Sequence, residues 1–252
     1  MARRTALIVK RALQNGFDRL RRAGPLALCN GAIFIFAVWV FAGIAEEVHE
    51  QEHLQFENRI MQALRSGEPP VAIGPRWLAA VARDVTGLGS VAVLAGVVVL
   101  VAGFLALSRR YAAAGFVLAA SLGGAGLNQI LKTAFGRERP AEMLRLVEIH
   151  SHSFPSGHAM SSATIYLSLA VLLTRLAGSA RERAYIILAA LLVSGLVGVS
   201  RVYLGVHYPS DVIAGWAAGV AWALLCWFAV RLIGRRRLAN AAPAESGGPA
   251  AR

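Results

Sequence analysis

Three short polar segments in the second half of the chain carry the residues best suited to chemistry. Together they contain three cations, two histidines and one carboxylate, namely Lys132, Arg139, Arg201, His158, His207 and Asp211. A phosphate ester repels nucleophiles through its negative charge, so its cleavage needs positive groups fixed around its oxygens. Three fixed cations could supply them without a metal ion. This combination therefore indicates phosphate chemistry.

The segment Pro155-Ser156-Gly157-His158 is predicted to form a phosphate-binding turn. It precedes an apolar run that is expected to be helical, and the unpaired N–H groups and dipole at a helix start favour an anion. Gly157 lets the backbone come close to the ligand. The planar forks of Arg139 and Arg201 suit phosphate oxygens bidentately, while Lys132 acts as a point charge.

His207 is the predicted nucleophile, with Asp211 four residues after it. Pro209 lies between them and is well suited to the first turn of a helix. An aspartate on one ring nitrogen fixes the tautomer and leaves the lone pair of the other nitrogen free to attack phosphorus. His158 would then protonate the leaving lipid oxygen and afterwards activate the water that splits the phosphohistidine.

Each of these residues also has an ordinary explanation when it is taken alone. Lys132 could snorkel from a helix end, Arg139 could contact a headgroup, His158 could be a polar cap, and Asp211 could be a favourable acid in a first helical turn. The phosphate interpretation depends on their combination at one face of a membrane.

The three segments resemble the signature of the type 2 phosphatidic acid phosphatases, which reads K-x6-R-P, then P-S-G-H, then S-R-x5-H. Every block is present here at full spacing, and the likeness covers about residues 88–233. It implies a six-helix fold and a metal-independent phosphomonoesterase or diphosphatase, with His207 as nucleophile and His158 as acid and base. The phosphate ligands that it implies are Lys132, Arg139, Ser156, Gly157 and Arg201.

The composition requires a solvent other than water. Apolar residues make up 56% of the 252 residues and charged residues only 16%, whereas soluble domains have about 45–50% and about 25%. The formal net charge of +12 could suggest nucleic acid. However, the basic residues gather at the two ends and in short turns between apolar runs, as in cytoplasmic loops of membrane proteins. Nucleic-acid binding is therefore not predicted.

Six apolar runs are predicted to be transmembrane helices, so we expect an all-α polytopic fold with both termini in the cytoplasm. The runs are 25–45, 88–107, 111–131, 159–176, 184–203 and 212–233. Every basic cluster then lies on the same side of the membrane. The polar segments with the candidate site residues lie on the other side, together with the loop 46–87. An amphipathic piece near 77–85 is expected within that loop.

The chain divides into four predicted parts. Residues 1–24 form a basic cytoplasmic end, 25–87 the first span with its external loop, 88–233 the catalytic membrane domain, and 234–252 a disordered cytoplasmic tail. A cleaved signal peptide is the alternative for the first span, since Gly43 and Ala45 form a small-x-small pair. We expect close helix packing at two groups of glycines, one in the last span and one in the third, namely Gly215, Gly219, Gly123, Gly124 and Gly126.

One further motif competes with the phosphate site. His49-Glu50-Gln51-Glu52-His53 matches HExxH, in which two histidines bind zinc and the glutamate acts as a base. A solvated helical face in a glutamate-rich segment explains it as well, and no third ligand stands at a familiar spacing. We therefore predict no metal and no cofactor, and the motif's affinity for metal stays open.

Four other polar residues near the site have weaker claims. His150 and His152 are expected to be loop residues that could touch a headgroup. Asn128 could orient Lys132 or serve as polar packing between helices. Arg137 is a weaker candidate than Arg139 because no signature position falls on it.

The sequence thus predicts a bacterial inner-membrane lipid phosphatase whose site faces the periplasm or the cell exterior. Candidate substrates are undecaprenyl diphosphate, phosphatidylglycerophosphate and phosphatidic acid, taken from the bilayer. The alternatives are a phosphotransferase that passes the phosphate to a lipid or sugar hydroxyl, and a protein that uses the anion site only for binding or transport. The sequence leaves open the lipid and the oligomeric state.

Overall fold

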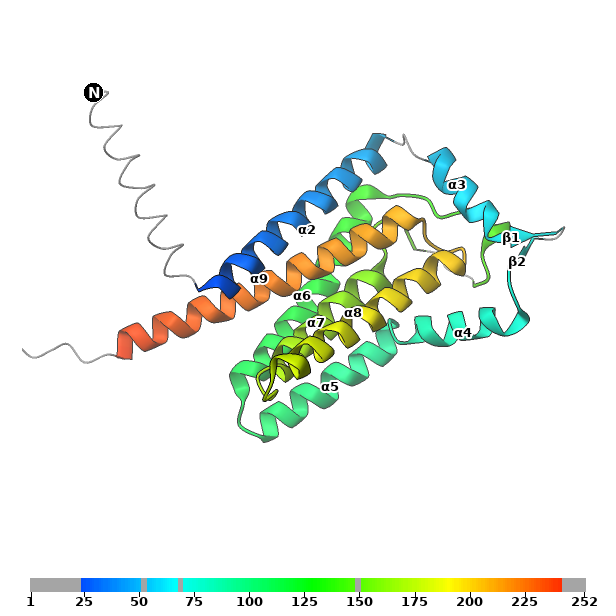
Figure 1. Cartoon of the computed structure of the whole chain (residues 1–252). Helices are drawn as coiled ribbons and strands as arrows, with labels where there is room; N and C mark the ends of the chain where they lie inside the picture. The colour runs from blue at the N-terminus through cyan, green and yellow to red at the C-terminus, as the bar shows by residue number, and fades with distance from the viewer. Residues whose placement is uncertain (1–23, 51–53, 68–69, 148–150, 242–252) are drawn as a thin grey trace, which may run out of the picture.

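The structure is a computed structural model that describes residues 24–50, 54–67, 70–147 and 151–241. Within these residues the chain is almost entirely helical, which confirms the predicted all-α class (Figure 1). Apart from loops, the other elements are a short ribbon, β1 (Arg65–Ser66) paired with β2 (Val71–Ala72), and the 3-10 turn η1 (Glu142–Leu144). The α-helices are α2 (Pro25–Glu50), α3 (Leu54–Ala63), α4 (Arg76–Gly87), α5 (Val91–Leu107), α6 (Tyr111–Phe135), α7 (Gly157–Leu173), α8 (Ala180–Tyr203) and α9 (Pro209–Ala241).

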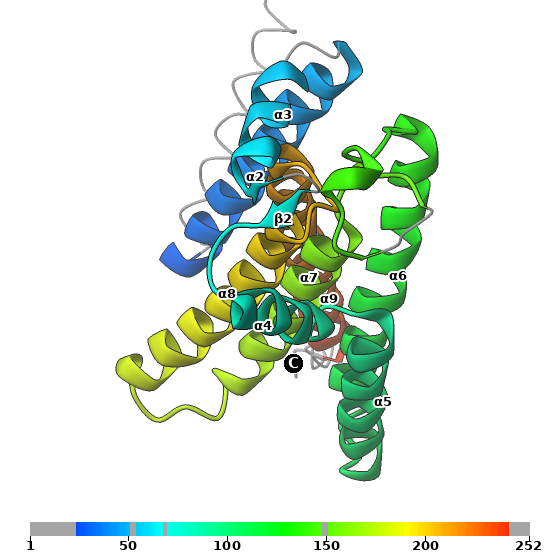
Figure 2. The same cartoon turned by 90° about the vertical axis from the view of Figure 1, so that its right-hand side faces the viewer.

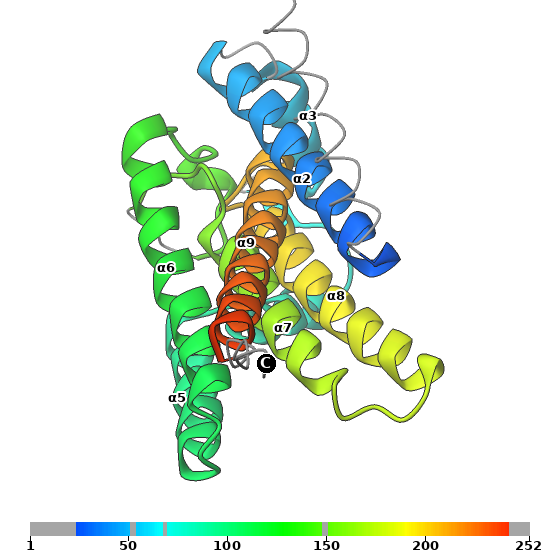
Figure 3. The same ribbon diagram turned by 90° about the vertical axis from the view of Figure 1, so that its left-hand side faces the viewer.

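Helix α7 forms the centre of the bundle. It packs most extensively against α9 and α8, and also against α6 and α5. Figure 3 shows α2 lying along α9 and the pair α5–α6 on the other side of the bundle. Figure 2 shows α4 crossing beside α8, with α3 and the ribbon at the same end of the molecule. The loops that carry the candidate site residues meet at this end.

The close approach of α7 and α9 depends on the two glycines of the last span. A Cβ atom on Gly215 would lie 2.7 Å from the carbonyl oxygen of Ser156, and one on Gly219 would lie 2.6 Å from that of Met160. Any larger side chain would push the two backbones apart. The expected packing role of Gly215 and Gly219 is confirmed, and it fixes the start of α7 beside the start of α9.

The other predicted glycine group divides. A Cβ on Gly123 would lie 2.3 Å from the Trp222 ring, and one on Gly124 would lie 3.3 Å from it. At Gly126 a Cβ would meet nothing within 4 Å. Gly123 and Gly124 therefore serve close packing against α9 as expected, and for Gly126 that expectation was wrong.

The predicted count of six spans is not confirmed. Four helices of the described chain are long and apolar enough to cross a membrane, namely α2, α6, α8 and α9. Helices α4 and α5 pass the same test only together, with a 41° bend between them, and α7 is apolar but has 17 residues. A helix of 17 residues is about 25 Å long, which is less than the roughly 30 Å of hydrocarbon in a bilayer. The predicted spans 88–107 and 159–176 thus correspond to shorter helices.

Several element boundaries also differ from the predicted ones. Helix α2 runs about one turn beyond residue 45, to Glu50, and α9 continues beyond residue 233 to Ala241. The predicted amphipathic piece at 77–85 is confirmed as α4. The basic residues 1–23 and the end of the tail, 242–252, lie outside the described residues.

Large apolar side chains cover the outside of the bundle. Trp39 on α2 is 69% exposed and Leu100 on α5 is 75% exposed. In water such surfaces would cost free energy, whereas acyl chains solvate them. A buried apolar cluster joins α5, α6 and α7 on the inside, and includes Leu94, Val117 and Ile165. The described helices therefore form a membrane-embedded bundle.

Candidate active site

The corner between α8 and α9 brings Arg201 and His207 to the same place. Arg201 lies in the last turn of α8 and is 3% exposed, and His207 is 1% exposed. Gly205 adopts a left-handed conformation with φ 76°, in which the Val206 N–H bonds the carbonyl oxygen of Arg201 at 3.2 Å. Pro209 then starts α9. The glycine lets the chain reverse within a few residues, so both side chains face the interior.

The two ring nitrogens of His207 have different surroundings. Nδ1 lies 3.4 Å from Oδ2 of Asp211, and Nε2 lies 3.2 Å from a guanidinium nitrogen of Arg139. The same Asp211 oxygen accepts hydrogen bonds from the Ser153 hydroxyl and, at 2.9 Å, from the Tyr208 N–H. The predicted contact between His207 and Asp211 is therefore present, and Nε2 faces the cations.

His207 is neutral at ordinary pH in this environment. Burial lowers the pKa of its imidazole from 6.5 to about 3, although the hydrogen bond and the charge of Asp211 act in the opposite direction. The positive charges of Arg139 and Arg201 lower this pKa further. A neutral imidazole that carries its proton on the Asp211 side has a lone pair on Nε2, which is the form that can attack an electrophile.

The loop after α6 fixes two of the predicted cations. Gly136 ends α6 in the left-handed conformation (φ 57°), just after Lys132 in the last helical turn. The Lys132 ammonium donates to the carbonyl oxygen of His152, and Arg139 donates to the same oxygen at 3.1 Å and to that of Ser151 at 2.6 Å. Burial lowers the pKa of Arg139 to about 10, so the guanidinium stays charged at neutral pH.

Two of the predicted phosphate ligands contain polar atoms without a partner. Ser156 precedes α7, but its hydroxyl does not cap the helix and has no hydrogen-bond partner. The Nε atom of Arg201 is likewise buried without a partner, while its NH1 donates to Thr86 at 3.2 Å. Among the described residues the third such buried side-chain atom is the hydroxyl of Ser168. Because an unpaired buried polar group costs about 1–3 kcal/mol, these two atoms suit a site that a polar ligand completes.

Gly157 allows α7 to approach α6 closely. A Cβ there would lie 3.0 Å from Oδ1 of Asn128 and 3.7 Å from Cε of Lys132. The amide nitrogen of Asn128 donates to the sulfur of Met160 at 3.4 Å. Asn128 thus contacts α7, which favours the packing alternative for this residue.

The structure brings all eight predicted site residues to one end of the bundle. The charges of Arg201, Arg139 and Lys132 all act on His158, the second residue of α7. Arg139 and Arg201 also act on His207. Such a group of like charges is unfavourable when it is empty and becomes favourable when an anion enters it. The arrangement can therefore hold a phosphate between two histidines.

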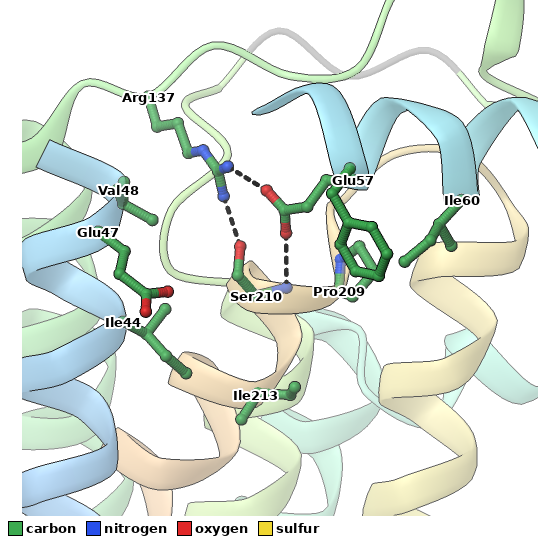
Figure 4. A pocket seen from close by; sticks show the side chains of 10 residues that line it. Ile44, Glu47, Val48, Glu57, Ile60, Arg137, Pro209, Ser210 and Ile213 are labelled. Carbon is green, nitrogen blue, oxygen red and sulfur yellow. Dashed lines mark hydrogen bonds and ion pairs between the residues drawn. The ribbon is translucent and has the colours of Figure 1, made fainter. Parts of the chain in front are cut away.

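Arg137 has a larger place in the site than the sequence indicated. It donates to Oδ1 of Asp211 at 2.6 Å, to the Ser210 hydroxyl at 2.8 Å, and to the carboxylate of Glu57 on α3 (Figure 4). Burial opposes its charge, but the carboxylates of Asp211 and Glu57 raise the pKa of Arg137 above its ordinary value. Glu57 in turn accepts the Ser210 N–H at 3.0 Å and is 5% exposed.

The sequence missed Glu57 and Ser153, and placed Arg137 below Arg139. Glu57 lies 154 positions before Asp211, in an amphipathic segment that carries no recognisable motif. A cavity of about 360 Å³ beside it is lined mainly by apolar side chains of α2, α3 and α9, and its polar lining residues are Glu47, Glu57, Arg137 and Ser210 (Figure 4). Neither His207 nor Arg139 lines this cavity.

The competing HExxH motif is only partly described. His49 and Glu50 end α2, and residues 51–53 lie outside the described residues, as does His150. No three histidine, cysteine, aspartate or glutamate side chains of the described chain gather as potential metal ligands. The His152 side chain is exposed, and its main-chain oxygen is the part that contacts the cations.

Known proteins share both the sequence pattern and the fold. Residues 110–235 match the model of the PAP2 superfamily. The chain is 33% identical over 201 residues to phosphatidylglycerophosphatase B of Bacillus subtilis (strain 168), which covers 79% of this chain and 92% of that protein. It is 36% identical over 108 residues to a lipid A 1-phosphatase of Rhizobium johnstonii, which covers 39% of this chain and 40% of that protein. The crystal structure of a transmembrane PAP2 type phosphatidylglycerolphosphate phosphatase from Bacillus subtilis superimposes with a TM-score of 0.69 at 28% identity, over 82% of this chain and 96% of that one.

Proposed function

This chain belongs to the PAP2 superfamily, and the relatives described above are phosphatases. We therefore propose that it hydrolyses a lipid phosphate or diphosphate through a phosphohistidine on His207. The observation that carries the proposal is the set of unsatisfied groups at the end of the bundle where His207 lies. The Ser156 hydroxyl and Arg201 Nε lack partners there, among three cations that act on each other. A bound phosphate would satisfy these atoms and neutralise the repulsion.

The proposed first step transfers the phosphoryl group to the enzyme. Lys132, Arg139, Arg201, the Ser156 hydroxyl and the backbone at Gly157 hold the nonbridging oxygens. Nε2 of His207 attacks phosphorus in line while the bond from phosphorus to the lipid oxygen breaks, and His158 gives its proton to that oxygen. Asp211 accepts the Nδ1–H and stabilises the positive charge that develops on the ring.

The second step returns the enzyme to its starting state. His158, now neutral, removes a proton from a water molecule, whose oxygen attacks the phosphohistidine. The bond from phosphorus to Nε2 breaks, and inorganic phosphate leaves with His158 protonated again. The side chains of the protein supply all the positive charge in this scheme, so we expect no metal requirement. The basic residues of the turns support an orientation with the site at the outer face of the membrane.

Trapping the phosphoenzyme tests the mechanism. With a radiolabelled short-chain lipid phosphate, the wild type should give transient labelling on His207 and release inorganic phosphate. His207→Asn should give neither label nor phosphate. His158→Asn should form the label more slowly, because the leaving lipid oxygen is no longer protonated, and should then keep it for much longer, because water is no longer activated. Persistent turnover in His207→Asn would disprove the proposal.

A control and an acceptor panel complete the experiment. His49→Asn changes an exposed histidine of the HExxH motif and should keep wild-type turnover, with or without EDTA, because phosphate transfer needs no metal in this scheme. Adding candidate lipid and sugar hydroxyls tests the phosphotransferase alternative. Label that appears on an acceptor in preference to inorganic phosphate would favour that alternative over hydrolysis.

A further inference from the structure

Figure 1 shows the turn between α5 and α6 at the end of the bundle opposite the α8–α9 corner. A cavity of about 660 Å³ lies at this turn, between α5, α6 and α7. Helix α6 joins the two ends. It starts beside the cavity at Tyr111 and reaches Lys132 after 21 residues, which is about 32 Å of helix. The hydrocarbon core of a bilayer has about this thickness. The cavity is therefore at the opposite membrane face from His207.

The lining of this cavity combines apolar walls with cations. The walls come mainly from Leu100 and Phe104 of α5 and from Leu169, Leu172 and Leu173 of α7. Arg109, Arg110 and Arg175, from the turns at the helix ends, complete the lining. We call this cavity the arginine pocket. Its volume lies within the range of about 300–1,000 Å³ that is usual for ligand sites.

The three arginines have no anionic partner within the described part of the chain. Their side chains make no hydrogen bond or ion pair with any other described residue, and no residue that lines the pocket is acidic. All three are exposed. By contrast, Arg137 at the other end is bound by two carboxylates. The arginine pocket therefore has uncompensated positive charge beside an apolar cavity.

The backbone of the turn between α5 and α6 also favours an anion in the arginine pocket. Arg109 has φ 56°, a left-handed conformation that is unfavourable for a residue other than glycine. Arg110 precedes α6, and no side chain caps the first N–H groups of that helix. These N–H groups and the helix dipole favour an anion in the same place as the guanidinium groups.

We propose that the arginine pocket binds one anionic phospholipid of the bilayer. The phosphate lies among Arg109, Arg110 and Arg175 at the start of α6, and an acyl chain lies against the leucines and phenylalanine of the walls. Charge complementarity selects an anionic headgroup, and the continuous apolar wall selects a lipid over a free phosphate ion. This is a second lipid site, distinct from the site at His207 and independent of the reaction there.

Native mass spectrometry of the full-length protein in detergent tests the proposal, with phosphatidylglycerol or phosphatidylcholine added. Phosphatidylglycerol is a phosphodiester without a terminal phosphate, so the proposed hydrolysis of a lipid phosphate or diphosphate does not consume it. We expect the wild type to retain one phosphatidylglycerol in preference to phosphatidylcholine. The double variant Arg109→Gln/Arg175→Gln should bind it about thirtyfold more weakly, because each cation near a membrane surface contributes a factor of about five.

Two further variants distinguish loss of the pocket from a general loss of positive charge and from misfolding. Arg181→Gln/Arg183→Gln removes two charges from the start of α8, outside the pocket, and should bind like the wild type. Arg109→Gly relieves the left-handed strain, so it should fold at least as well as the wild type and still bind about fivefold more weakly. Equal binding of both lipids, unchanged binding in Arg109→Gly, or an equal loss in the Arg181/Arg183 variant would each overturn the proposal.

Discussion

Arg137 and Glu57 should control the protonation of His207 in opposite directions. Asp211, Arg137 and Glu57 form one buried chain of contacts with a combined charge of about −1, and His207 contacts its Asp211 end. Arg137→Gln makes the chain more negative and should raise the pKa of the imidazole. Glu57→Gln leaves Arg137 paired with Asp211 alone, so the combined charge becomes about zero and the pKa of the imidazole should fall. The double variant keeps the original sum and should leave the pKa of His207 near its wild-type value.

The size of the effect follows from the distances. Arg137 lies 2.6 Å from one oxygen of Asp211, and His207 lies 3.4 Å from the other. With the width of the carboxylate included, the guanidinium of Arg137 is about 7 Å from the ring of His207. Two unit charges at that distance interact by about 2 kcal/mol at an effective dielectric constant of about 20. This energy equals about 1.5 pKa units. Arg137→Gln should therefore move the pKa of His207 from about 3 to about 4.5.

The rate at which diethyl pyrocarbonate modifies His207 measures this pKa, because the reagent attacks only neutral imidazole. Peptide mass spectrometry assigns the modification to His207 and avoids interference from the ionisation of a phosphate substrate. In the wild type and in Glu57→Gln the rate should stay constant down to about pH 4. In Arg137→Gln it should fall with a midpoint near pH 4.5, as worked out from the Coulomb energy above.

The control for this experiment is Glu142→Gln. Glu142 is almost fully exposed and lies 3.7 Å from Arg145. The substitution therefore removes an arginine–glutamate ion pair that does not contact Asp211. Its profile should match that of the wild type. An unchanged midpoint in Arg137→Gln, or a raised midpoint that persists in the double variant, would refute the charge argument.

Two more predictions concern stability. The pKa of His207 is about 3 in the folded protein and about 6.5 in the unfolded chain. The contribution of neutral His207 to the free energy of unfolding is therefore complete above about pH 6.5 and is lost as the pH falls toward 3. The wild type should lose about 2 kcal/mol more than His207→Asn between pH 7 and pH 5, which unfolding in detergent at both pH values would show; equal losses would contradict it. Gly205→Ala should cost about 3 kcal/mol or more, because φ is 76° and the new Cβ would lie 2.0 Å from the Leu144 carbonyl oxygen. Gly103→Ala, inside α5 where a Cβ meets nothing within 4 Å, should leave the unfolding midpoint unchanged or slightly raised, and a similar result for Gly205→Ala would argue against the strained corner.

Local sequence was sufficient to predict the all-α class and to select the candidate site residues that the structure brings to one end of the bundle. Apolar length and the position of arginines predict membrane helices because each helix satisfies its own backbone hydrogen bonds. The three polar segments could be recognised because the residue types and short spacings within each are read along the chain. Gly215 and Gly219 likewise indicated close packing of the last span, and the structure identified α7 as the partner.

Tertiary structure alone decided how these parts act on one another. The pairing of Arg137 with Glu57 joins α3 to Asp211 across 154 positions of sequence, and no local pattern marks such a contact. A bend of 41° separates α5 from α4, and α7 has 17 residues, so the count of six full spans was not confirmed. The unpaired atoms of Ser156 and Arg201 likewise exist only because the surrounding elements exclude other partners. Sequence determined which groups could bind phosphate, and packing determined which of them are left without a partner to do so.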